Sequence, residues 1–76
     1  MKELIHHMAQ ALVDNSNEIM IKEISTEQTL VLELRVAKED LGKVIGKKGR
    51  TAQAMRTILA CASAKNQKRA ILEIVE

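Results

Sequence analysis

Hydrophobic residues recur at helical spacing over the first thirteen positions of the chain. Apolar side chains separated by one, three and four residues form one stripe within residues 2–13, at Leu4, Ile5, Met8, Ala11 and Leu12. This spacing predicts an amphipathic helix. The turn-forming run Asp14-Asn15-Ser16-Asn17 follows directly, so we expect the helix to end there.

The next two segments are short and have the pattern of β-strands. Residues 19–24 are rich in β-branched side chains, and every second position of residues 30–36 is aliphatic, at Leu30, Leu32, Leu34 and Val36. An alternation of period two predicts a strand with one buried face. Because only a short polar stretch separates the two segments, we expect them to pair as an antiparallel hairpin.

The period changes to that of a helix after Ala37. Leu41, Val44 and Ile45 share one helical face, which predicts a short helix ending at Gly46. A longer, alanine-rich helix is expected over residues 50–64, with an apolar face formed by Ala52, Met55, Ile58, Leu59 and Ala62. Residues 70–75 are expected to form a third strand. The order α-β-β-α-α-β predicts an α+β fold in which three helices cover one face of a three-stranded sheet.

The composition limits the classes of protein that the chain can represent. With 76 residues, of which 46% are hydrophobic and 29% charged, it is expected to form one small folded domain. Its apolar runs are too short to span a bilayer, and its start lacks the apolar region of a signal peptide, so we expect a cytoplasmic protein. The absence of Phe, Tyr and Trp excludes RNA recognition by stacking on sheet aromatics.

Two features that often carry chemistry are interpreted as structural. Cys61 is the single cysteine, which excludes an internal disulfide and a cysteine-rich zinc site, and its alanine-rich helix predicts a buried, inert thiol. His6 and His7 are adjacent on a helix, where neighbouring side chains point about 100° apart, so they do not form a metal clamp. We therefore expect neither enzymatic activity nor a cofactor.

The formal net charge of +2 conceals a strong division along the chain. Residues 1–40 carry four basic and eight acidic side chains, whereas residues 41–69 carry eight basic side chains and no acidic one. A run of like charge is typical of a solvated face, and it is also typical of a surface that binds a phosphate backbone. The charge pattern alone leaves both interpretations open.

The three glycines of the chain fall within eight residues, and two of them enclose a pair of lysines. In Gly46-Lys47-Lys48-Gly49, the glycines permit a tight turn between two helices that must reach the same sheet. The lysines would be exposed just before a helix N-terminus, whose free amides and partial positive charge suit phosphate. The alternative is an interhelical turn whose lysines only aid solubility.

The run Asp40-Leu41-Gly42-Lys43-Val44-Ile45-Gly46-Lys47-Lys48-Gly49-Arg50-Thr51 resembles the GXXG signature of KH domains. Together with the order of elements, it is similar over essentially all 76 residues to the small stand-alone bacterial KH proteins of the KhpA family. The resemblance implies a single type II KH domain over residues 1–76 with a mixed sheet, in which residues 30–36 pair in parallel with the last strand. It also implies single-stranded RNA in a groove beside the loop, where KH domains hold about four nucleotides.

The resemblance assigns the RNA-binding residues to the loop and its flanks. The sugar-phosphate backbone would be held by the side chains of Lys47 and Lys48 and by the amides of Gly49 and Arg50. Ile45 would form an aliphatic floor for bases. The full set of expected RNA-binding residues is Lys43, Val44, Ile45, Gly46, Lys47, Lys48, Gly49 and Arg50.

Several positions near the loop have other or auxiliary roles. Lys43 and Arg50 are interpreted as auxiliary phosphate contacts, and Val44 is favoured as a core residue over a groove residue. Thr51 is expected to cap the long helix, and the alternative role for its side chain is a contact with phosphate. Arg56 lies more than a turn further along that helix and is not assigned to the site.

Two other glycine motifs fit less well. A Walker A loop needs four residues between its glycines, but Gly42 and Gly46 enclose three, so nucleotide hydrolysis is not expected. A helix-hairpin-helix motif, which binds DNA, resembles G-x-G and remains a minor alternative.

A different class of function is a KH-like scaffold whose main role is to dimerise or recruit a partner. The alanine-rich helix permits close approach of another helix, and a small core gains from burial against a partner. The resemblance implies homodimers, pairing with a larger multidomain KH protein, RNA chaperoning, and control of cell elongation or cell-wall synthesis. Neither a membrane nor a small-molecule substrate is expected as a partner.

Overall fold

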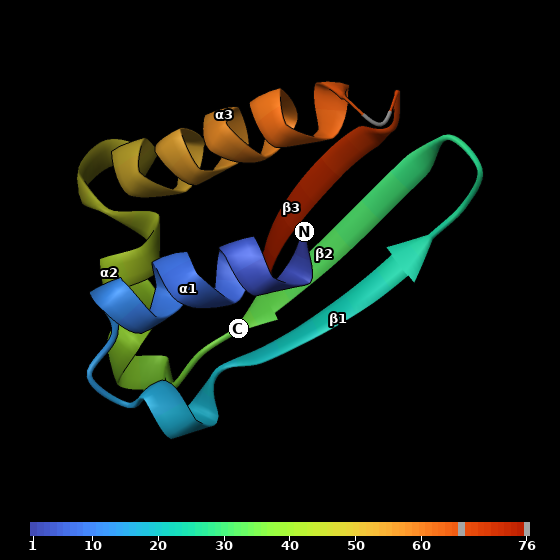
Figure 1. Cartoon of the computed structure of the whole chain (residues 1–76). Coiled ribbons are helices and arrows are strands. Elements are labelled where there is room, and N and C mark those ends of the chain that lie inside the picture. Colours follow the sequence, from blue (N-terminus) through green and yellow to red (C-terminus); the bar gives the residue numbers. More distant parts are fainter. Residues whose placement is uncertain (66, 76) are drawn as a thin grey trace.

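The helices and strands follow the order that the hydrophobic pattern predicts. A computed structural model describes residues 1–65 and 67–75. Its main elements are α1 (Lys2–Leu12), β1 (Met20–Ser25), β2 (Thr29–Arg35), α2 (Leu41–Ile45), α3 (Arg50–Ala64) and β3 (Arg69–Val75) (Figure 1). The α+β class and the α-β-β-α-α-β order are therefore confirmed.

The three strands form one mixed sheet in the order β1-β2-β3. β1 and β2 are antiparallel, with Lys22 opposite Glu33. β2 and β3 are parallel, with Leu32 opposite Leu72. Both the expected hairpin and the expected parallel pairing of the last strand are confirmed.

The core lies against the face of the sheet that carries the even-numbered residues of β2. Leu30, Leu32 and Leu34 are buried there, and the last two have no exposed surface. α1 adds Ile5 and α3 adds Leu59, and both are fully buried. Because burial of such a side chain contributes about 1.5–3 kcal/mol, this cluster holds the helices on the sheet.

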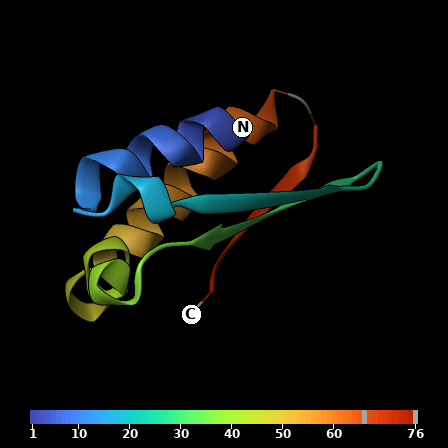
Figure 2. The ribbon, with the colours of Figure 1, turned by 90° about the horizontal axis from the view of Figure 1, so that it is seen from below.

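The helices lie on one side of the sheet and leave its other face uncovered. α1 and α3 cross the buried face, and α2 lies at the end where β2 leaves the sheet (Figures 1 and 2). The uncovered face includes the exposed side chains of Met20 and Ile24 in β1. Among the described residues, no helix has the length and apolar character that a membrane crossing requires.

Several helix positions differ from the sequence prediction. The side chains that α3 buries are Ala52, Met55, Leu59 and Ser63. This orientation leaves Ile58, predicted as core, 47% exposed on the flank, and it leaves Cys61, predicted as a buried thiol, exposed as well. In α1 the buried alanine is Ala9, whereas Ala11 is exposed. The helical spacing predicts which apolar side chains share a face of a helix. Which of these side chains are buried depends on how the helix packs against its neighbours.

Candidate functional site

The loop between α2 and α3 is built on backbone conformations with positive φ. Gly46 has φ 77° and ψ 172°, a combination that is open in practice only to glycine, and Gly49 has φ 73°. Lys48 also has a positive φ, 57°, in the left-handed region that few other residue types adopt. Residues 47–49 form a single 3₁₀ turn, so the chain reverses within a few residues.

A second reason for glycine at position 46, besides its positive φ, is the close approach of the loop to α3. A Cβ atom at this position would lie 2.1 Å from Oγ1 and 2.8 Å from the amide nitrogen of Thr51. Since real Cβ contacts essentially never fall below 3.0 Å, no side chain fits at Gly46. The expected capping role of Thr51 is wrong, because the N-cap of α3 is Gly49 and no side chain makes a capping hydrogen bond there.

The loop presents three cations without acidic partners. Lys47, Lys48 and Arg50 are exposed, and the part of the chain that the structure describes provides no ion pair to any of them. They lie at or just before the start of α3, where the helix dipole is positive. The amides of Gly49 and Arg50, which were expected to face the sugar-phosphate backbone, donate within the loop to the carbonyls of Gly46 and Lys47. An anion can approach this turn without displacing an internal ion pair.

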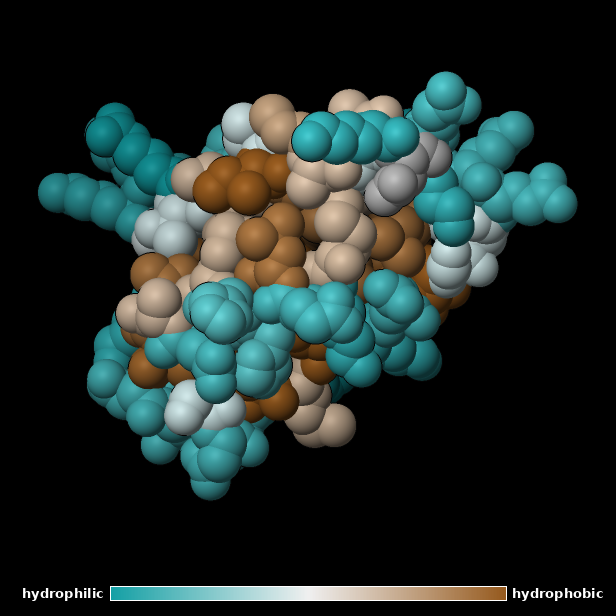
Figure 3. Space-filling view, viewed as in Figure 1, coloured by the Kyte–Doolittle hydropathy of each residue, from teal (hydrophilic) through white to brown (hydrophobic). Residues whose placement is uncertain are grey.

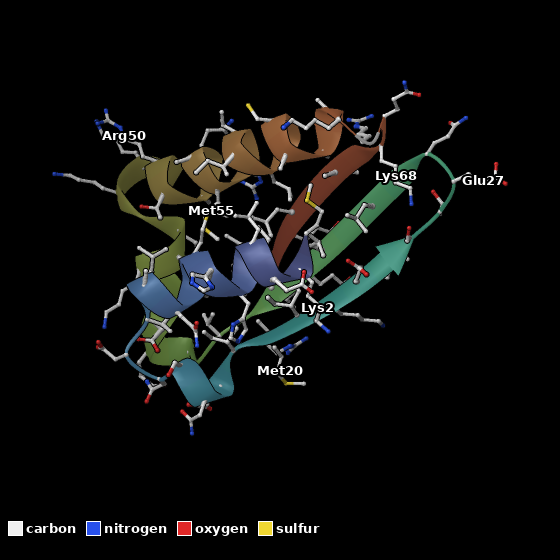
Figure 4. All side chains as sticks on the ribbon, in the orientation of Figure 1. Lys2, Met20, Glu27, Arg50, Met55 and Lys68 are labelled. Carbon is white, nitrogen blue, oxygen red and sulfur yellow. The ribbon has the colours of Figure 1, made fainter. Side chains whose placement is uncertain are left out.

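The remaining cations of the acid-free segment are not all close to the loop. Lys65, Lys68 and Arg69 lie at the other end of α3, and Figure 4 shows Arg50 and Lys68 at opposite ends of the molecule. Lys68 Nζ donates a hydrogen bond of 2.8 Å to Ser25 Oγ at the end of β1. Apart from Arg56 in the middle of α3, the basic side chains of this segment therefore lie toward the two ends of that helix.

Lys43, an expected auxiliary phosphate contact, lies in a local ion-pair network. Its ammonium group contacts the carboxylates of Asp14 and Asp40, the second at 3.4 Å. These contacts raise the pKa of Lys43, and the hydrogen bond to Asp14 is the largest cause. The positive charge of Lys43 is thus compensated within the protein, unlike the charges on the loop.

Asp40 is a buried carboxylate that joins α2 to the segment following α1. It is 1% exposed, and it accepts hydrogen bonds from the backbone amides of Asp14 at 3.3 Å and Asn15 at 3.0 Å. The bond from the Asn15 amide is the main reason why the pKa of Asp40 is lowered, although burial acts in the opposite direction. Sequence analysis missed this anchor, because its donors lie 25 and 26 residues away and no local pattern points to them.

The residues before the loop divide between core and surface. Val44 has no exposed surface and packs in the core, whereas Ile45 is 37% exposed beside Gly46. Gly42 lies one turn before Gly46, and its carbonyl accepts the Gly46 amide at 2.9 Å. A Cβ at Gly42 would have no neighbour within 4 Å, so nothing inside the protein requires glycine there. Gly42 and Ile45 therefore form an open strip that leads to the loop.

The histidines do not form a competing metal site. Within residues 1–65 and 67–75, no group of three or more His, Cys, Asp or Glu side chains is placed to hold a metal ion. His6 and His7 border an open hollow of about 720 Å³ between α1 and β1, whose lining includes Lys2 and Met20 but no residue of the loop. The loop and its flanks remain the candidate site.

Replacing Gly42, within α2, and Gly46, at the end of α2, by alanine should change the free energy of unfolding in opposite directions. Gly46→Ala is expected to lower the free energy of unfolding by about 1–3 kcal/mol, because of the positive φ and the clash with Thr51. Gly42→Ala is expected to raise it by up to about 1 kcal/mol, because the space is open and alanine is the better helix former. Urea denaturation followed by circular dichroism measures both changes. Similar effects at the two positions would contradict the close approach at Gly46.

The network around Asp40 should make stability depend on acidic pH. Because the pKa of Asp40 is lowered in the folded state, its contribution is present above the unfolded-state pKa and is lost as the pH falls through the folded-state value. Asp40→Asn should therefore be less stable than the wild type at pH 7, and the difference should shrink as the pH falls below about 4. Urea midpoints measured over a pH series test this. A difference that is constant with pH would show that the charge of Asp40 contributes nothing.

Comparisons with known proteins agree with this arrangement. Residues 2–74 match the family described as KhpA/KhpB, KH domain. A protein of Clostridium acetobutylicum named RNA-binding protein KhpA is 48% identical over 75 residues, which span 99% of this chain and the whole of the relative. Proteins of the same name from Caldanaerobacter subterraneus and Aquifex aeolicus are 51% and 49% identical, over 99% and 100% of this chain and 100% and 96% of their own lengths.

These relatives carry the name of binding proteins and not of enzymes, which supports the absence of a catalytic assignment. No solved structure matches the chain significantly. The family match and the identities over nearly full length both agree with the GXXG loop and the order of elements. The chain therefore belongs to the KhpA/KhpB family of KH domains.

Proposed function

We propose that this protein binds single-stranded RNA at the loop of residues 46–49. The observation that carries the proposal is the exposed charge of Lys47, Lys48 and Arg50, which no acidic group compensates within the described part of the chain. Backbone phosphates would contact the side chains of the two lysines near the positive end of the α3 dipole, with Arg50 as a further contact. The name RNA-binding protein KhpA, carried by relatives at 48–51% identity, supports RNA as the ligand.

The strip that leads to the loop suits the bases of such a strand. Ile45 offers exposed aliphatic surface, and Gly42 lets a ribose or base approach the backbone of α2. Because the chain has no aromatic residue, bases would pack on these aliphatic groups instead of stacking on rings. Lys43 contributes less to phosphate binding than the loop lysines, because Asp14 and Asp40 compensate its charge.

The resemblance to the family extends the proposal to a role in the cell. It implies that the chain acts as a single KH domain in the cytoplasm, as an RNA chaperone or post-transcriptional regulator in the control of cell elongation or cell-wall synthesis. Contacts to phosphate carry affinity but little sequence information. Such a module is suited to hold many different RNAs weakly.

Charge reversal on the loop tests the site. Lys47→Asp/Lys48→Asp should weaken binding of a labelled single-stranded RNA at least about tenfold, because charge-assisted contacts to phosphate are lost. The slope of log affinity against log salt should become shallower by about 1.4 if two phosphate contacts are removed. The variant should fold, because aspartate tolerates the left-handed backbone of Lys48 better than most residues. Fluorescence titrations at two salt concentrations, with circular dichroism of each protein, measure these changes.

Lys2→Asp/Lys22→Asp is the matched control, because it changes the net charge equally at exposed positions on α1 and β1. It should retain most of the affinity. Duplex RNA and single-stranded DNA are titrated in parallel to define the ligand. If both double variants lose affinity equally, or if the loop variant binds like the wild type, residues 46–49 are a structural turn and the proposal is wrong.

A second candidate function is association through the flank of α3. Ile58 is 47% exposed on this alanine-rich helix, and Figure 3 shows apolar surface in the region between α3 and α1. Apolar surface that remains in contact with water on a small protein marks a candidate interaction site. We propose that this flank supports a homodimer, or a heterodimer with a larger multidomain KH protein, as the resemblance to the family implies.

Ile58→Glu should abolish self-association without affecting the fold. Sedimentation equilibrium should give the wild type a mass that rises with concentration toward that of a dimer, whereas Ile58→Glu keeps the mass of one chain. Ile24→Glu is the control, because Ile24 has a similar exposure of 42% but lies on the uncovered face of the sheet. A wild type that stays monomeric, or an equal loss of mass in both variants, would exclude a homodimer through this flank.

A further inference from the structure

β1 is an end strand, and among the described residues no helix or strand pairs with its outer edge. In Figure 1 it runs along the border of the sheet, and β3 forms the opposite border. All residues of β1 except Ile21 are exposed. Because an end strand presents unpaired N–H and C=O groups on its outer side, this edge has backbone partners for a further strand.

An open hollow of about 720 Å³ lies between β1 and α1. Its lining includes Ile21 and Lys22, which point to opposite faces of the sheet, so the hollow extends around the outer edge of β1. Lys2 and His6 of α1 line it as well, and Figure 4 shows Lys2 beside β1. Since neighbouring strands lie about 4.8 Å apart, a strand that pairs with this edge would enter the hollow.

The pairing with β2 shows which side chains suit β1 on the uncovered face of the sheet. Ile24 lies opposite Val31, and Lys22 lies opposite Glu33. Cross-strand pairs of these two kinds, aliphatic and oppositely charged, stabilise neighbouring strands. Met20 and Ile24 flank Lys22 on this face and are 66% and 42% exposed. A strand that matches the outer edge of β1 therefore carries aliphatic, acidic and aliphatic side chains at alternate positions.

The charges around the hollow also favour an acidic side chain in its occupant. Lys2 and Lys22 are exposed, and neither ammonium group forms an ion pair within residues 1–65 and 67–75. The acidic groups of the lining are Glu3 and Glu33. Glu3 is compensated by the N-terminal ammonium group at 3.6 Å. An acidic side chain beside Lys22 would thus meet a cation that no carboxylate holds.

We propose that the outer edge of β1 binds an extended segment of a partner protein as an additional strand of the sheet. The segment has the alternating aliphatic, acidic and aliphatic pattern. In this mode of recognition, main-chain hydrogen bonds provide affinity and alternate side chains provide selectivity. RNA fits this edge less well, because a sugar-phosphate backbone lacks the regular row of N–H and C=O groups with which a strand edge pairs.

Two labelled peptides test this selectivity on the whole protein. The first is a capped seven-residue peptide of threonine with valine at its second and sixth positions and glutamate at its fourth. The second has lysine in place of the glutamate. Fluorescence anisotropy should show that the wild type binds the glutamate peptide at least about fivefold more tightly than the lysine peptide. Lys2→Asp/Lys22→Asp should reverse the preference, because the charge beside the central position changes sign.

Lys47→Asp/Lys48→Asp is the matched control, because it changes the net charge equally but lies between α2 and α3. It should keep the preference of the wild type for the glutamate peptide. Circular dichroism checks the fold, and Lys22→Gln, which should remove the preference, provides the test if Lys2→Asp/Lys22→Asp does not fold. RNA titrations of the same variants show separately whether the loop binds RNA.

Three results would overturn the proposal. The wild type binds the two peptides equally or binds neither, or both double variants change the preference alike. Lys2→Asp/Lys22→Asp weakens binding of single-stranded RNA and leaves peptide binding unchanged, which would assign the hollow to nucleic acid. In sedimentation equilibrium, Lys2→Asp/Lys22→Asp abolishes self-association of the wild type, which would assign the edge to a second copy of the chain.

Discussion

The chain has to reverse direction between Val44 and Met55, because both side chains are buried in the same core. The reversal is confined to residues 46–49, between the end of α2 and the start of α3. Such a tight turn uses positive φ values, and it brings Gly46 so close to Thr51 that no Cβ fits. The two residues between the glycines then remain in solvent. The packing of the core and the exposure of the loop lysines thus have the same physical origin.

Compensation of charge decides which cations are available to a ligand. Lys43 is held by Asp14 and by the buried Asp40, whose hydrogen bonds also fix the start of α2 against the segment after α1. Lys68 donates a hydrogen bond to the neutral hydroxyl of Ser25, which does not compensate its charge, but it lies at the far end of α3 from the loop. The loop cations have no acidic partner within the described residues, and the positive end of the α3 dipole lies beside them. Their position, more than the number of basic residues in the segment, favours the loop as the site.

Patterns that are local in the sequence predict most of the fold. The alternation of Leu30, Leu32 and Leu34 requires a strand with one buried face, and all three are buried in the core. The predictions that are wrong depend on distant neighbours. Helical spacing places Ile58 on the apolar side of its helix, but it does not show whether another element covers that flank, and Ile58 is exposed. The thiol of Cys61 is exposed because no other element within the described residues covers its side of α3.

The candidate site shows the same division between local and distant information. The GXXG loop is contiguous, so its residues can be recognised directly in the sequence. The anchor at Asp40 cannot be recognised in this way, because its donors come from Asp14 and Asn15. Arg56 has its partner in Leu72, which only the packing of α3 along β3 brings near. That the backbone of Gly42 has open space beside it can likewise be recognised only from the structure.

Amide chemical shifts during an RNA titration locate the bound strand most directly. With ¹⁵N-labelled protein and a short single-stranded RNA, binding at the loop predicts the largest shifts at the amides of Lys47, Lys48 and Arg50. The amides of Ile24 and Val31, on strands that lie away from the loop, should change little. The largest shifts on those strands, with the loop amides unmoved, would contradict binding at the GXXG loop.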